Sequence, residues 1–336
     1  MQYDKNARQA SGFKSDGSVF MKFFQYDYIL AVAEERSFTK AAKKLFIAQP
    51  SLSQYVMSVE KELGVELFDR GSSPIRLTDA GRLFIDTAYQ IMSLQDQLVN
   101  QINDITNLKI GHFIVGMTAF RTSCILPHTL ASYKQRWPDI RVGLVTGLTS
   151  ELGNYAREGR LDIFITIESE LNKNLFDFEP IAAEKIILAV PPDSPMNKTL
   201  AQYRISMDDI MNNCLTPPDV KPVPLSLFKD EIFVCVGQSQ NLYIITSEMC
   251  RRAGFEPRIL LHNRSVESIF AMTVAGLGIS FMPTTYIKYA NIARHAAYYC
   301  IDDDLTERNL VVAYKKKHYL PHSCKEFIST MKRTIQ

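Results

Sequence analysis

The spacing of apolar and polar positions changes along the chain, and each change predicts a different kind of element. Residues 37–79 carry short apolar runs separated by polar turns, which predicts two short helices followed by a hairpin. Ser37 or Thr39 can cap the first helix, because a hydroxyl oxygen accepts from the unpaired N–H groups at a helix start. Pro50 suits the first turn of the second helix, and Gly64 suits its C-cap.

The second of these helices has one apolar side and one polar side. Its apolar residues recur at spacings of four, three and four, at Leu52, Val56, Val59 and Leu63. We expect that side to be buried. The polar side presents short or amide-bearing groups that can approach DNA bases and phosphates, with Gln49, Pro50, Ser51, Ser53 and Gln54 as the expected groove contacts. Two short helices and a hairpin in this order are typical of a DNA-binding helix-turn-helix with a wing.

A single long helix is predicted next. From residue 78 to about residue 107 the chain has no proline and, after Gly81, no glycine, so the helix would span roughly 45 Å. Apolar residues repeat every seven positions, which favours pairing with another long helix over packing on the same domain. We therefore expect a homodimer, and the expected contact residues are Phe84, Ala88, Ile91, Leu98, Ile102 and Ile105.

After residue 108 short β-rich runs alternate with helical stretches. Strands are expected at residues 112–117, 140–145, 162–167, 185–190, 231–236, 258–262, 279–282 and 309–314, and helices at about residues 123–135 and 149–158. This alternation predicts α/β sheets with helices on both faces.

Ligands of such sheets bind beyond the carboxyl ends of strands, where helices begin. The residues at those places are Thr118, Ala119, Phe120, Thr149, Ser150, Gln238, Ser265 and Val266. Hydroxyls and unpaired N–H groups at helix starts suit a carboxylate or another small anion. The same serines and threonines would also serve as ordinary N-caps with no ligand.

Composition limits the interpretation without deciding it. A chain of 336 residues is long enough for two or three domains, and its net charge of +2 requires any basic surface to be local. Lys40, Arg70 and Arg76 are the expected phosphate contacts. The chain has no run of about 18 apolar residues, and residues 1–20 have no apolar core of the kind a secretory signal needs. We therefore expect a cytoplasmic protein that does not enter the membrane, with residues 1–20 as a disordered extension.

Several of these residues together carry a family resemblance. They are Phe38, Ala41, Ala42, Leu45, Gln49, Pro50, Ser51, Leu52, Ser53, Glu60, Leu63, Gly64, Leu67, Phe68, Arg70, Leu77, Thr78, Asp79, Ala80 and Gly81. In these positions the chain resembles the N-terminal domain of LysR-type transcriptional regulators. One departure is Gln54, where many members carry arginine; an amide pairs well with adenine and so changes the expected target sequence.

The resemblance implies the whole architecture. It implies a winged helix-turn-helix at residues 21–79, a linker helix at 80–108 that pairs antiparallel in the dimer, and an effector domain at 109–336. That domain would be α/β with two subdomains, like a periplasmic binding protein: residues 109–183 and 288–336 form one and residues 184–287 the other. The resemblance also implies that the predicted ligand residues converge on one cleft.

The implied function is regulation of transcription. The chain would bind double-stranded promoter DNA as a dimer or tetramer, with RNA polymerase as a further partner. A small-molecule effector, expected to be anionic, would favour one closure of the two subdomains and so change the spacing of the DNA-binding domains.

The chain also contains residues that could suggest an enzyme, a thiol sensor or a solute-binding module. Gly276 and Gly278 begin like a dinucleotide fingerprint, but Phe281 stands in place of its third glycine. We expect no catalysis, no cofactor and no bound metal. Two alternatives stay open: a regulator that senses oxidation through thiols, with Cys235 and Cys250 as the nearest candidates, and a solute-binding module without sequence-specific DNA binding.

Overall fold

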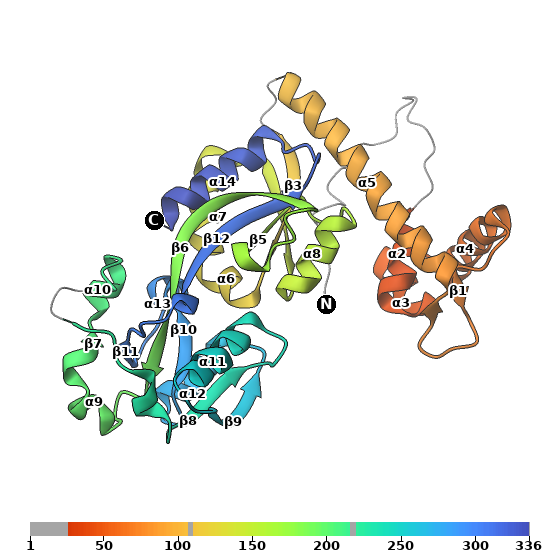
Figure 1. Ribbon diagram of the computed structural model, residues 1–336. Coiled ribbons are helices and arrows are strands. Elements are labelled where there is room, and N and C mark those ends of the chain that lie inside the picture. Colours follow the sequence, from red (N-terminus) through yellow and green to blue (C-terminus); the bar gives the residue numbers. More distant parts are fainter. Residues whose placement is uncertain (1–25, 107–109, 216–219, 336) are drawn as a thin grey trace. The chain divides into compact units, whose positions relative to one another are not determined.

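The computed structural model describes residues 26–106, 110–215 and 220–335 (Figure 1). The chain divides into two compact units, and the boundary between them falls between Asn100 and Gln101, inside a long helix. The expected extension at residues 1–20 lies outside the described residues. No helix in the described part of the chain has an apolar stretch of the length that a membrane crossing requires.

The N-terminal unit is a three-helix cluster with a two-stranded wing and the start of the long helix. Its elements are α2 (Tyr26–Glu35), α3 (Phe38–Leu45), α4 (Gln49–Leu63), β1 (Phe68–Asp69), β2 (Arg76–Leu77) and α5 (Asp79–Ile105). Ser37 caps α3 by accepting from the Lys40 N–H at 3.4 Å. Gly64 ends α4 at a φ of 71°, which glycine adopts without strain. These predicted caps are confirmed.

The predicted apolar side of α4 is confirmed at three of its four positions. Leu52, Val56 and Val59 are buried in a core shared with α2 and α3, whereas Leu63 is 44% exposed. The last buried position belongs instead to Glu60, which is 8% exposed. A carboxylate is tolerated there because the wing supplies hydrogen-bond donors to it. The spacing of apolar residues alone could not indicate that Glu60 is buried in place of Leu63.

The C-terminal unit contains a mixed sheet of eight strands and a separate pair of strands. The first subdomain contains β3 (Gly111–Met117), α6 (Ala119–Cys124), α7 (Leu126–Arg136), β4 (Ile140–Thr146), α8 (Thr149–Arg157), β5 (Ile163–Ile167), β12 (Glu307–Lys315) and α14 (His322–Thr334). Strands β4, β3 and β5 are parallel, and β12 is antiparallel to β5. The expected helix at residues 123–135 is two helices that meet at Ile125.

One long strand, β6 (Phe176–Val190), runs through both subdomains (Figure 1). Its first part pairs with β12, and its last residues pair with β10 (Ser280–Pro283) and β11 (Ala297–Tyr299). The sequence predicted only its second part, from residue 185, because the first part is interrupted by polar residues and Pro180.

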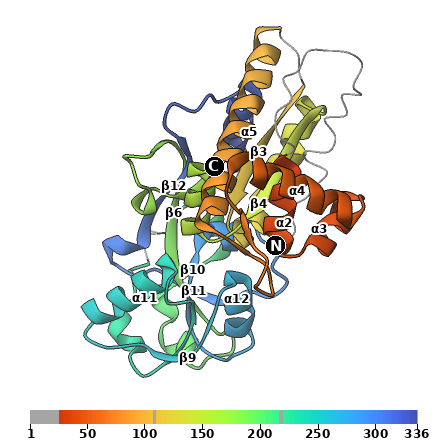
Figure 2. The same ribbon diagram turned by 90° about the vertical axis from the view of Figure 1, so that its right-hand side faces the viewer.

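The second subdomain is built on the far end of β6. It contains α9 (Met196–Thr199), β7 (Arg204–Ile205), α10 (Met207–Met211), β8 (Ile232–Val236), α11 (Asn241–Arg252), β9 (Arg258–Asn263), α12 (Val266–Val274), β10, α13 (Thr284–Tyr289) and β11. In the view of Figure 2, α11 and α12 stand on either side of β10 and β11. Because β11 pairs with β7 as well as with β6, the chain returns to the first subdomain only after Tyr299. The predicted return between residues 287 and 288 is therefore too early.

The start of α5 leaves no room for a side chain at Gly81. A Cβ atom there would lie 2.0 Å from the carbonyl oxygen of Leu67, which belongs to rigid backbone next to the wing. We predict that Gly81→Ala destabilises the N-terminal unit by about 1–3 kcal/mol, because the helix and the wing must separate. Urea unfolding of the variant measures the change.

Gly153 provides the matched control. It lies inside α8, and a Cβ atom added there would have nothing within 4 Å, so Gly153→Ala should stabilise the protein by about 0.5–1 kcal/mol through helix propensity alone. Equal effects of the two substitutions would show that the close approach at Gly81 does not restrict the fold.

Candidate DNA interface and ligand cavity

The first two turns of α4 contain the side chains that were predicted to contact DNA. Gln49, Pro50, Ser51 and Gln54 are exposed, and Ser53 is half-buried. The residue that precedes the helix is Ala48, whose side chain makes no cap hydrogen bond. An uncapped helix start carries partial positive charge and attracts phosphate. The surface is therefore suited to docking in a DNA groove.

Two basic side chains elsewhere in the N-terminal unit remain available to a partner. Lys40 on α3 and Arg76 on β2 are exposed, and neither side chain has an ion pair or hydrogen bond to another described residue. Both can therefore reach phosphates without breaking a contact within the protein.

Arg70 has a different environment. Its Nη2 lies 2.6 Å from Oε2 of Glu60, and its guanidinium lies 5.4 Å from the ring centre of Phe38. Oε1 of Glu60 accepts from the backbone N–H groups of Leu67 at 2.8 Å and Phe68 at 3.2 Å. Glu60 thus joins α4 to the wing, and the positive charge of Arg70 neutralises its carboxylate. Arg70 is a structural residue first, and it is a weaker candidate for phosphate contact than Arg76.

The predicted dimer seam of α5 has two parts. Phe84, Ala88 and Ile91 pack within the N-terminal unit, where Ala88 is buried beside Tyr26 and Leu30 of α2. Leu98, Ile102 and Ile105 are 58%, 50% and 80% exposed. Only the second part is open to a partner helix. Two further apolar residues that the heptad count omitted, Leu94 and Val99, are exposed on the same stretch.

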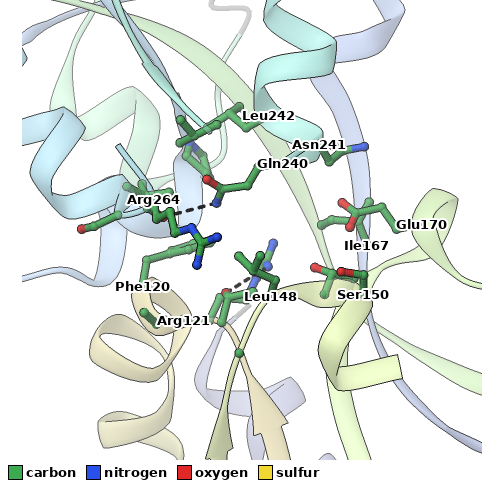
Figure 3. Close-up of a pocket in the computed structure, with 18 of the residues that line it drawn as sticks. Phe120, Arg121, Leu148, Ser150, Ile167, Glu170, Gln240, Asn241, Leu242 and Arg264 are labelled. Carbon is green, nitrogen blue, oxygen red and sulfur yellow. Dashed lines mark hydrogen bonds between the residues drawn. The ribbon is translucent and has the colours of Figure 1, made fainter. Parts of the chain in front are cut away.

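A cavity of about 540 Å³ lies between the two subdomains of the C-terminal unit (Figure 3). Its walls come from the segments that follow β3, β4 and β5 on one side and β8 and β9 on the other. These are the carboxyl ends of strands, where α/β proteins hold their ligands. The volume lies within the range of small-molecule sites, about 300–1,000 Å³.

The structure brings seven of the eight predicted ligand residues to this cavity. They are Thr118, Ala119, Phe120, Thr149, Ser150, Ser265 and Val266. Gln238 does not line it, whereas the residues that follow, Ser239, Gln240 and Asn241, do. The sequence interpretation placed Arg264 at this edge beside Ser265 and Val266, but it missed the other charged lining residues, namely Arg121, Glu151, Glu170, Glu267 and Arg308. Arg308 reaches the cavity only through the pairing of β12 with β6.

Two of the helix starts around the cavity, those of α8 and α12, are capped by side chains of the protein, whereas Thr118 before α6 and Gln240 before α11 make no side-chain cap hydrogen bond. Glu151 accepts from the Leu148 N–H at 2.9 Å, and Ser265 accepts from the Ser268 N–H at 3.0 Å. Gln240 accepts from the Gly237 N–H at 2.9 Å. The capped N–H groups at α8 and α12 are therefore occupied before any ligand arrives, whereas the starts of α6 and α11 have no side-chain cap.

A buried ion cluster forms the floor of the cavity. Glu184 of β6 is 1% exposed, and its Oε2 lies 3.3 Å from Nη2 of Arg121 and accepts a hydrogen bond from Arg308. Its Oε1 accepts from the hydroxyl of Thr285. Arg121 is on α6, Arg308 on β12 and Thr285 on α13, so one carboxylate joins both subdomains and the strands that cross between them.

The charges of this cluster explain its protonation state. Burial is the largest single effect on the Glu184 carboxyl and opposes its ionisation, but Arg308 and Arg121 together outweigh it. The pKa of Glu184 therefore lies below its usual value. Two guanidinium groups share one carboxylate, so the cluster carries one unbalanced positive charge next to the cavity.

The cysteines do not resemble a redox sensor. All six are free thiols, and only Cys214 is exposed. Burial raises the pKa of both Cys235 and Cys250 to about 12. A thiol that stays protonated reacts poorly with peroxide, so the structure disfavours the thiol-sensing alternative. In the described part of the chain no group of histidine, cysteine and acidic residues is arranged to hold a metal ion.

Comparison with known proteins covers nearly the whole chain. Residues 23–82 match the family model described as "Bacterial regulatory helix-turn-helix protein, lysR family", and residues 107–336 match "LysR substrate binding domain". The regulator BenM of Acinetobacter baylyi is 30% identical over 264 residues, which are 77% of this chain and 79% of BenM. The uncharacterized regulator YcgK of Bacillus subtilis is 25% identical and covers 92% of this chain and 94% of its own.

Solved structures agree in fold. CbnR, described as a LysR family transcriptional regulator, superposes with a TM-score of 0.63 at 20% identity, covering 94% of this chain and all of that one. The same protein in complex with its target DNA gives a TM-score of 0.62 at 21% identity, covering 94% of this chain and all of that one.

The buried cluster allows a direct test. We predict that Glu184→Gln destabilises the protein by about 3–5 kcal/mol, because two buried guanidinium groups lose their counter-charge. The matched control is Glu179→Gln on the same strand, whose ion pair with Lys332 at 2.7 Å is partly exposed and should contribute less than about 1 kcal/mol. Denaturant unfolding at neutral pH measures both.

The effect of Glu184→Gln on the free energy of unfolding should also depend on pH, which supplies a second readout. Because the folded pKa of Glu184 is depressed, its stabilisation is present above the ordinary value of 4.5 and is lost as the pH falls through the folded pKa. The gap between wild type and Glu184→Gln should therefore narrow below pH 4.5. A gap that widens there would contradict the assignment.

Proposed function

The chain belongs to the LysR family of bacterial transcriptional regulators. We propose that the first two turns of α4 bind DNA and that the cavity between the subdomains binds an effector. The observation that carries the proposal is the exposed start of α4, which has no side-chain cap, together with the exposed side chains of Lys40 and Arg76 in the same unit. Helix starts and unpaired basic groups position a protein on phosphates, and exposed amides read base edges.

The ligand response follows from where the cavity lies. Both subdomains line it, so a small molecule that contacts both walls favours the closure in which it makes more contacts. The ligand can shift this equilibrium only by its difference in affinity for the two states. Strand β6 is continuous from one subdomain to the other, and we infer that the subdomains move about it and about the segment that returns to β12. Helix α5 would then transmit the change to the DNA-binding unit.

We propose a homodimer built through the exposed part of α5. Leu94, Leu98, Ile102 and Ile105 form an apolar stretch that a second copy of the helix could cover. Two copies present two α4 helices, which suits an inverted repeat in promoter DNA. A tetramer of two such dimers, contact with RNA polymerase and action in the cytoplasm extend this proposal. The relatives are regulators, and we assign no catalytic step to the cavity.

Gln54 tests the assignment of base contacts. The duplex that wild-type protein enriches most from a random-sequence library serves as the target. Gln54→Ala should lose about 1–3 kcal/mol of binding energy on this duplex and much less on a scrambled one, because a base contact is lost and phosphate contacts remain. Fluorescence anisotropy at fixed salt gives both affinities. Equal losses on both duplexes would show that Gln54 does not read a base.

Arg76 tests the assignment of phosphate contacts. Arg76→Ala should weaken binding to both duplexes alike and reduce the slope of log affinity against log salt by about 1, because one counterion-releasing contact is lost. Lys61→Ala is the control, since this exposed lysine lies in the last turn of α4. An unchanged salt slope for Arg76→Ala, or the same change for Lys61→Ala, would place the DNA elsewhere.

A further inference from the structure

The charged groups that line the cavity are balanced. Three are cationic and three are anionic: Arg121, Arg264, Arg308, Glu151, Glu170 and Glu267. Glu184 adds one further negative charge beneath the floor. A ligand with only negative groups could pair with the arginines, but it would leave the lining carboxylates without a cationic partner. A ligand that carries both signs would meet partners on both walls.

Most of these charged groups are already engaged. Arg121 and Arg308 contact Glu184, Glu151 caps the start of α8, and Glu267 accepts from the hydroxyls of Ser123 and Ser265. Two side chains differ from them. In the described part of the chain, neither the guanidinium of Arg264 nor the carboxylate of Glu170 has a hydrogen bond or ion pair to another side chain or to the backbone, and Glu170 acts on Arg121 only through its charge.

Arg264 and Glu170 belong to different subdomains and lie on different sides of the cavity. Arg264 precedes α12 in the second subdomain, and its guanidinium points into the space between the walls (Figure 3). Glu170 ends the short turn after β5 in the first subdomain and lies near Ser150 in the same view. The remaining lining is partly apolar, with Phe120, Leu148 and Leu242 among it.

We propose that the effector is an amino acid, whose carboxylate binds Arg264 and whose ammonium group binds Glu170, with its apolar part against Phe120 and Leu148. This inference rests on the function proposed above, since it names the ligand of the same cavity. It retains the carboxylate expected from the sequence and adds a cationic group. Because each charged end contacts a different subdomain, only a molecule with both ends holds the subdomains together.

Matched analogues separate the two ends of the ligand. The panel contains the twenty common α-amino acids, 4-aminobutanoate and 6-aminohexanoate. The best member is then compared with its analogue lacking the ammonium group and its analogue lacking the carboxylate; for leucine these are 4-methylpentanoate and 3-methylbutylamine. Thermal unfolding of the full chain gives a first ranking, and calorimetric titration gives each Kd.

We expect an amino acid to bind at least about tenfold more tightly than either analogue, because each analogue leaves one charged wall unpaired. A carboxylate analogue that binds as tightly as the amino acid overturns the proposal in favour of a simple anion. The absence of binding by every member of the panel at millimolar concentration also overturns it.

Two substitutions assign the ends to residues. Arg264→Gln should weaken the amino acid and the carboxylate analogue by about tenfold and leave the amine unchanged, whereas Glu170→Gln should weaken the amino acid and the amine. The controls are Arg258→Gln on β9 and Glu168→Gln in the same short turn, because neither residue lines the cavity. Control variants that lose affinity as the test variants do would contradict the assignment.

Selection of DNA by the same preparation keeps the two proposals distinguishable. Enrichment of a specific duplex together with no amino-acid binding would refute the ligand class and leave the DNA-binding proposal intact. Amino-acid binding without any enriched duplex would refute the proposed DNA reader and support the ligand class.

Discussion

The C-terminal unit depends on a single buried carboxylate. Glu184 lies on the strand that runs through both subdomains, and it holds Arg121 of the first subdomain, Arg308 of the returning strand and Thr285 of the second. Taking these charges out of water is costly, and apolar side chains could pack there at no such cost. What the cluster adds is a fixed geometry where the strands cross, together with an unbalanced positive charge under the cavity. We infer that this geometry sets the axis about which the subdomains close.

The N-terminal unit also depends on a buried carboxylate that accepts hydrogen bonds from other parts of the unit. Glu60 is buried on α4, and its carboxylate accepts from two backbone N–H groups next to the wing and from Arg70. A hydrogen bond to a charged group contributes more than a neutral one and fixes direction. The wing is thereby held at a set angle to the helix whose first turn faces outward. In each unit an internal carboxylate positions the surface that is proposed to meet a partner.

The sequence was most informative where a structure depends on neighbouring residues. Pro50, Gly64 and the spacing of Leu52, Val56 and Val59 predicted α4 correctly, because caps and helical periodicity are local properties. The burial of Glu60 in place of Leu63 was missed, since its donors come from the wing. The pairing of Glu184 with Arg308 was missed for the same reason, because residues 124 apart in sequence meet only through the β6–β12 register. The charged lining of the cavity is likewise a product of long-range pairing.

The central claim is that the outward face of α4 reads a DNA sequence for an effector-responsive regulator. Selection of bound duplexes from a random-sequence library, carried out at two salt concentrations, tests it most directly. The account predicts enrichment of an inverted repeat whose half-site centres lie about 10 base pairs, or a small multiple of that, apart, and its persistence at the higher salt. Binding without any enriched sequence, abolished by salt, would contradict it, because phosphate contacts alone would then explain the affinity.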